Sequence, residues 1–141
     1  MPRLKRPTTV AGGVAWLRIA TGVVLSIAPR SVLRLQATDE PSGSLVLMTR
    51  TVGIRDLVVG IGSLAALRSG SDGDLRRWVR VGLLSDVLDA LAGAFGARLV
   101  GKRGASVSAL VPVPVIVADL CALSMLNNDD RYRSTARIPI E

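Results

Sequence analysis

The sequence predicts an all-α protein, a bundle of four transmembrane helices around a buried network of arginine and aspartate. Nearly half of its 141 residues are hydrophobic, and the apolar residues gather in four segments: 9–28, 45–67, 78–100 and 105–126. Each segment has about the ~20 residues that a helix needs to cross ~30 Å of hydrocarbon. Charged residues also fall inside all four segments, so the helices are expected to pair their charges with one another.

The distribution of polar residue types favours a membrane protein. Lysine occurs only at Lys5 and Lys102, glutamate only at Glu40 and Glu141, and glutamine only at Gln36, all outside the apolar segments. These three types normally cover the surfaces of soluble helices. A compact soluble helical domain is the alternative, but four helices that are apolar on most faces cannot all be central in so short a chain.

The first segment follows a basic start, MPRLKR, and places Ala11, Ala15, Arg18 and Gly22 on one helical face. A basic front and an apolar middle are also typical of a secretory signal. Arg18 interrupts the apolar part, and no clear small-residue cleavage site follows. We therefore interpret this segment as the first span.

The second segment carries a narrow stripe of small and polar residues on one face, Thr49, Gly53, Asp56, Gly60 and Ser63, flanked by Arg50 and Arg55. On insertion scales, about ten strongly apolar residues favour membrane insertion by roughly 5 kcal/mol. Three charged residues near the helix centre oppose insertion by roughly 9 kcal/mol. This segment is therefore expected to cross a membrane only if its charges are paired with neighbouring helices.

The third segment shows the same type of stripe, and the fourth also has one face that carries an aspartate. In the third it is Gly82, Asp86, Asp89, Gly93 and Gly96, and in the fourth it is Ser108, Pro112, Val115 and Asp119. Small residues beside a polar one allow close packing of membrane helices. Two prolines, Pro112 and Pro114, predict either a cavity-forming kink or a simple bend before Asp119.

Apart from Arg98 near the end of the third segment, the charges inside the segments are four cations and four anions, and the interior is therefore expected to be neutral. The cations are Arg18, Arg50, Arg55 and Arg80, and the anions are Asp56, Asp86, Asp89 and Asp119. The alternatives for the aspartates are ion pairs that only fix helix register, or carboxylates that share a proton or bind a ligand.

Turn-forming, charged stretches separate the segments, and their charge predicts the orientation. Nine lysines and arginines lie on the side of the termini, against five on the other side, so both termini are predicted to be cytoplasmic. We expect one membrane domain over residues 1–127 and a polar cytosolic tail over 128–141. The localisation predicted is a multi-pass membrane protein.

The stretches RTVGIRDLVVG (50–60) and DVLDALAG (86–93) resemble the small four-helix membrane proteins of the DoxX-like families. In these families an Arg-Asp or Arg-Glu pair in the second helix precedes a glycine, and an aspartate-bearing third helix follows. The resemblance covers about three quarters of the chain. It implies an integral membrane bundle and no particular activity.

No catalytic motif is evident, so the catalytic residues are unknown. The absence of histidine excludes Ser-His and Cys-His catalysis and most zinc sites. We expect no cofactor, no metal and, with few aromatics and scattered arginines, no nucleic-acid partner. Asp86 and Asp89 are the catalytic candidates, and the candidates for a ligand or proton site are Arg18, Arg50, Arg55, Asp56, Asp86, Asp89 and Asp119.

Three hypotheses follow from these residues. The first is a non-enzymatic accessory or assembly subunit, or a binder of a small lipid-like molecule. The second is a membrane enzyme that acts on an isoprenoid, sterol or quinone-like substrate by aspartate acid/base chemistry. The third is a small proton-coupled transporter. The expected partners are the lipid bilayer, a lipid-like small molecule, and a larger membrane complex or a second copy of the chain.

Overall fold

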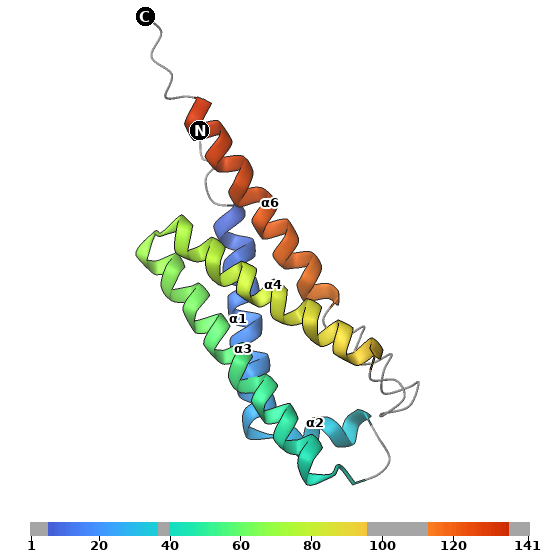
Figure 1. The fold of residues 1–141 in the computed structure, drawn as a ribbon. Helices are drawn as coiled ribbons and strands as arrows, with labels where there is room; N and C mark the ends of the chain where they lie inside the picture. Colours follow the sequence, from blue (N-terminus) through green and yellow to red (C-terminus); the bar gives the residue numbers. More distant parts are fainter. Residues whose placement is uncertain (1–5, 37–39, 96–112, 136–141) are drawn as a thin grey trace, which may run out of the picture.

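A computed structural model of the chain describes residues 6–36, 40–95 and 113–135. These residues form five helices and no strand (Figure 1), which confirms the predicted all-α class. The helices are α1 (Arg6–Ile27), α2 (Pro29–Gln36), α3 (Gly43–Ser69), α4 (Asp72–Phe95) and α6 (Val113–Thr135).

The four long helices pack as a ring. Helix α1 contacts α3 and α6, and α4 contacts the same two helices from the other side. Successive long helices alternate in direction, so that the start of α1 and the end of α6 lie at the same end of the bundle (Figure 1). The described ends of the chain therefore lie on one side, as the sequence predicted.

The helices differ from the predicted segments mainly at their ends. The stretch after the first segment is not a simple turn, because it forms the short helix α2. Helix α4 begins six residues before the predicted 78, where Ser71 Oγ accepts a hydrogen bond from Asp74 N at 3.2 Å and caps the new helix. Helix α6 continues to Thr135, beyond the expected start of the tail at residue 128.

Parts of two predictions lie outside the described residues. These are the end of the third segment from residue 96 and the start of the fourth segment up to residue 112, which includes Ser108 and Pro112. Pro114 lies in the first turn of α6. A proline in the first turn of a helix has no backbone N–H to lose from the helical hydrogen bonds, so Pro114 fits this position.

The α3–α4 connection is a tight hairpin. Helix α3 ends at Gly70, whose φ of 68° is left-handed and whose N–H bonds the carbonyl oxygens of Ala66 and Leu67. Only glycine adopts this conformation without strain, and it is the usual residue after a helix end. This hairpin places the middle of α4 beside the middle of α3.

Helices α1 and α3 approach one another through glycine. A Cβ atom built on Gly22 would lie 2.6 Å from the carbonyl oxygen of Gly53, and one on Gly53 would lie 2.8 Å from Leu25 Cβ. A Cβ on Gly60 would lie 2.8 Å from the carbonyl oxygen of Ala15. The two backbones are therefore in direct contact along most of their crossing.

The largest apolar cluster lies at the end of the bundle that holds the start of α1. Its buried members come from all four long helices: Ala11, Ala66, Leu75, Val79, Ala122 and Leu126. Half of these residues are alanine, which shows that close helix packing, rather than a layer of large side chains, fills this end of the core.

Hydropathy and length support a membrane location only in part. Among the described residues one helix, Thr8–Ile27, is long and apolar enough to cross a membrane, and Val113–Asn128 is a shorter apolar helix. Charged residues interrupt the other two long helices, Arg55 and Asp56 in α3 and Asp86 and Asp89 in α4.

The glycine contacts predict that Gly→Ala substitutions change the stability of the protein in opposite directions at two sites. Gly53→Ala should destabilise the protein by about 1–3 kcal/mol, because the new methyl group collides with the backbone and side chains of α1. Gly13→Ala, on the exposed side of the same crossing with nothing within 4 Å, should stabilise it by about 0.5–1 kcal/mol. Thermal unfolding followed by circular dichroism measures both changes, and equal effects at the two sites would contradict the packing described.

Candidate functional site

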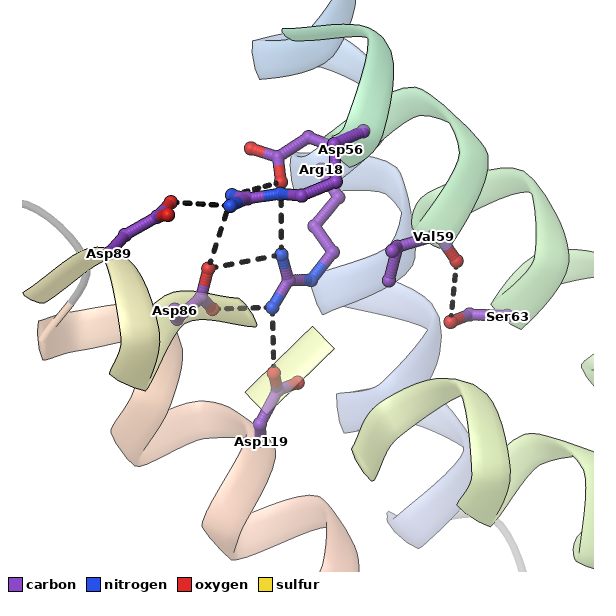
Figure 2. Close-up of polar contacts among 8 residues, drawn as sticks. Arg18, Asp56, Val59, Ser63, Asp86, Asp89 and Asp119 are labelled. Atoms are coloured by element: carbon purple, nitrogen blue, oxygen red, sulfur yellow. Dashed lines mark hydrogen bonds and ion pairs between the residues drawn. The ribbon is translucent and has the colours of Figure 1, made fainter. Parts of the chain in front are cut away.

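The guanidinium group of Arg18 binds an aspartate on each of the other three long helices (Figure 2). Arg18 Nη1 lies 3.3 Å from Asp56 Oδ1 on α3. Arg18 Nη2 lies 2.5 Å from Asp86 Oδ2 on α4 and 2.8 Å from Asp119 Oδ2 on α6. One side chain thus joins the whole ring of helices.

These four residues are buried. The side chains of Arg18, Asp86 and Asp119 are only 4%, 7% and 2% exposed, and that of Asp56 is 12% exposed. At low dielectric such hydrogen-bonded ion pairs interact strongly, and each group needs its partner to remain inside.

A glycine on α4 makes room for the guanidinium group. A Cβ atom on Gly82 would lie 2.8 Å from Arg18 Nη2, so any larger residue at this position would push Arg18 away from its acids. Gly82 lies one turn before Asp86 on the same face of α4, which explains the spacing of the predicted stripe.

Arg55 forms a second centre beside the first. Its Nη1 lies 2.5 Å from Asp89 Oδ2, and its Nη2 lies 3.1 Å from Asp56 Oδ1 and 3.8 Å from Asp86 Oδ1. The same Asp56 oxygen also faces Arg18, so the two arginines share this carboxylate. Arg55 and Asp89 lie at the edge of the network, with side chains 27% and 38% exposed.

The structure brings together six of the seven site residues that the sequence predicted. We call Arg18, Arg55, Asp56, Asp86, Asp89 and Asp119 the Arg/Asp network. Arg50 lies outside it, because its Nε donates to the carbonyl oxygen of Ser26 at 3.0 Å and its side chain is exposed. Arg80 is exposed as well, since it lies two positions before Gly82 and so points away from the network face of α4.

The expected charge balance is therefore not met by the described part of the chain. Two arginines face four aspartates in the network, which gives a formal charge of −2 when every group is ionised. The sequence correctly gave the charged residues of the interior, but the count of four cations was wrong because Arg50 and Arg80 belong to the surface.

The network geometry limits the chemistry that it can perform. The inner carboxylates, Asp86 and Asp119, hold their arginine partner and are closed to a substrate. Within the described ranges no group of three acidic or cysteine side chains is arranged to hold a metal ion. Asp89, at the exposed edge, is the network carboxylate most open to an incoming molecule.

The comparisons with known proteins give no match. No family model, curated protein or solved structure matches this chain. The site is therefore interpreted from its own geometry, and the DoxX-like resemblance stays a prediction.

The sequence did not reveal that Arg18 is the centre of the network. The available signal was its isolation, because Arg18 is the one charged residue between positions 7 and 29. An arginine alone in an apolar helix needs several acceptors for its five N–H donors, and the three aspartate-bearing helices offer them.

Removing Arg18 should have the largest effect of any single charge change. Arg18→Gln leaves Asp86 and Asp119 buried without their cation, so we expect a loss of about 3–5 kcal/mol in the free energy of unfolding. The matched control is Arg80→Gln, which removes an exposed arginine and should cost less than about 0.5 kcal/mol. Denaturant titration of both purified variants compares the two losses, and similar values would show that the network does not hold the bundle together.

Proposed function

We propose that the protein is an integral membrane protein with four spans and both termini in the cytoplasm. The observation that carries this proposal is the inverted distribution of side chains. Charged groups meet in the centre of the bundle, whereas large apolar side chains are exposed on all four long helices, among them Trp16, Leu17, Ile54, Val58, Leu84, Leu88, Val117 and Leu120.

The position of the exposed charges supports the same proposal. On α3 the exposed arginines are Arg50 and Arg68, towards its two ends, and the exposed residues between them include Ile54, Val58 and Ile61. On α3 this stretch without exposed charge, bounded by charged ends, matches the hydrocarbon layer and its two polar surfaces, whereas α4 carries the exposed Arg80. The charges that lower the hydropathy of α3 and α4 are paired inside the bundle, which removes most of their insertion cost.

Within the membrane we propose a non-enzymatic role, as an accessory or assembly subunit or as a binder of a small lipid-like molecule. The support is the closed state of the network centre. A general acid must reach the proton acceptor of its substrate at hydrogen-bond distance. Asp86 and Asp119 are already hydrogen-bonded to Arg18, so they do not reach a substrate in this arrangement. The network then acts as a clamp that fixes the four long helices in one register.

One observation favours a second candidate, a proton-coupled carrier. The network holds two more carboxylates than guanidinium groups among the described residues, and a charge of −2 is costly in a low-dielectric interior. Uptake of protons by the carboxylates removes this cost. In this candidate Asp89, at the exposed edge of the network, exchanges protons with water, and the inner acids respond through Arg55 and Arg18.

The membrane proposal predicts that a charge on the outer surface blocks insertion. Leu84→Glu, at a side chain 60% exposed in the middle of α4, should shift the protein from the membrane pellet to the aggregated or degraded fraction, at a cost of about 2.5–3.5 kcal/mol. Leu35→Glu, at a side chain 88% exposed on α2, is the control outside the long helices and should remain in the pellet. A soluble protein would tolerate both changes, so a supernatant that contains folded Leu84→Glu protein refutes the membrane proposal.

The non-enzymatic role is tested by purification from native membranes with Asp89→Asn as the variant. Asparagine keeps an oxygen for Arg55 but cannot exchange a proton, so the fold and any stoichiometric partner or bound lipid should be retained. Mass spectrometry identifies the copurified species. Loss of proton uptake or of a substrate conversion in a folded Asp89→Asn protein would favour the carrier or the enzyme over the accessory role.

A further inference from the structure

A recess of about 460 Å³ lies at the end of the bundle opposite to the start of α1, where α1, α2 and α3 meet. It is lined by the end of α1, by Pro29, Arg30 and Ser31 of α2, and by Val46 and Arg50 of α3. Its volume is within the range of small-molecule sites, which is about 300–1,000 Å³. It is separate from the Arg/Asp network and shares no residue with it.

Two arginines from different helices line this recess without a carboxylate partner. Neither Arg30 nor Arg50 forms an ion pair with an acid of the described residues, whereas Arg34, one turn from Arg30, lies 2.7 Å from Glu40. Arg50 is held in place by the bond from its Nε to the Ser26 carbonyl oxygen at 3.0 Å, and its side chain lines the recess. The recess therefore concentrates positive charge.

The surroundings of the recess identify the surface on which it lies. Helix α2 crosses the end of the bundle (Figure 1), with Arg30 and Arg34 exposed beside Leu35, whose side chain is 88% exposed. A short helix with both basic and apolar exposed residues, at the end of an apolar span, is typical of the membrane surface. This step rests on the proposed membrane location.

We infer that this recess binds the phosphate group of an anionic phospholipid. A guanidinium group offers two parallel N–H donors that match two phosphate oxygens, and two arginines line this recess together with Ser31, which is exposed. The apolar Val46 and Ile27 at the wall of the recess fit the glycerol and the first part of the acyl chains.

The test is the affinity of the full chain for phosphatidylglycerol and for phosphatidylcholine, measured by native mass spectrometry in detergent. The wild-type protein should prefer phosphatidylglycerol. Arg30→Gln should weaken this binding about fivefold, and Arg30→Gln combined with Arg50→Gln about 25-fold, since each arginine near an anionic headgroup contributes about 1 kcal/mol. Arg30 forms no hydrogen bond or ion pair with another described residue, so Arg30→Gln keeps the test valid if loss of the Arg50–Ser26 bond disturbs the fold.

The matched control is Arg68→Gln, which removes an exposed arginine at the opposite end of the bundle and should leave the affinity unchanged. Equal affinity of the wild type for both lipids, or unchanged affinity in Arg30→Gln, would overturn the proposal. Millimolar inorganic phosphate is added in a separate series. Complete displacement of the lipid by inorganic phosphate would show that the recess binds free phosphate instead.

The same experiment separates this inference from the membrane proposal. A protein that needs detergent but shows no headgroup preference retains its membrane location and lacks the lipid site. A protein that stays folded and monomeric without detergent contradicts the membrane location. The proposal that the bound phosphate belongs to a phospholipid is then contradicted as well.

Discussion

The bonds of Arg18 to three aspartates on three different helices are the interaction on which the bundle depends. A buried guanidinium group has a high desolvation cost, and only a full set of acceptors offsets it. Because the acceptors come from α3, α4 and α6, each helix must present its aspartate at the depth of Arg18. A shift of any helix by one residue would turn its carboxylate away, so this one side chain selects a single register for all four helices.

Close packing of small residues makes this interaction geometrically possible. Backbone contact through Gly22, Gly53 and Gly60 brings α1 and α3 together, and Gly82 leaves the space that the guanidinium group fills. Lipid competes for apolar contacts, so membrane helices associate through such contacts and through internal polar bonds more than through large apolar side chains. The same rule explains why the large apolar residues, Leu84 and Leu88 for example, are exposed.

The sequence predicted the all-α class, the faces of the helices and six network residues, since helical periodicity fixes which residues share a face. Asp56 and Asp86 lie inside because each falls on a stripe of small residues, and Asp119 lies on the buried face of α6 with Ala122 and Leu126. Periodicity does not fix how far a long side chain reaches or which neighbour it meets. Arg50 and Arg55 flank one stripe on opposite sides, yet Arg55 turns into the network and Arg50 bonds the end of α1. Helix α2 was missed because Pro29 and Ser31 were interpreted as turn residues, whereas proline is also favoured in the first turn of a helix and here begins α2.

The clamp and the proton carrier make opposite demands on the same atoms. A clamp is strongest when every carboxylate is ionised, but then the described network carries two negative charges in excess. A continuous path of bonds runs from Asp119 through Arg18, Asp56 and Arg55 to Asp89, from a side chain 2% exposed to one 38% exposed (Figure 2). Arginine keeps its proton, so protons cannot pass along this path from acid to acid. A proton gained at the exposed end affects the inner acids only indirectly, because it changes the negative charge that surrounds each arginine. A clamp therefore needs the four carboxylates to keep their charge, whereas a carrier needs that charge to change while the three bonds of Arg18 stay in place.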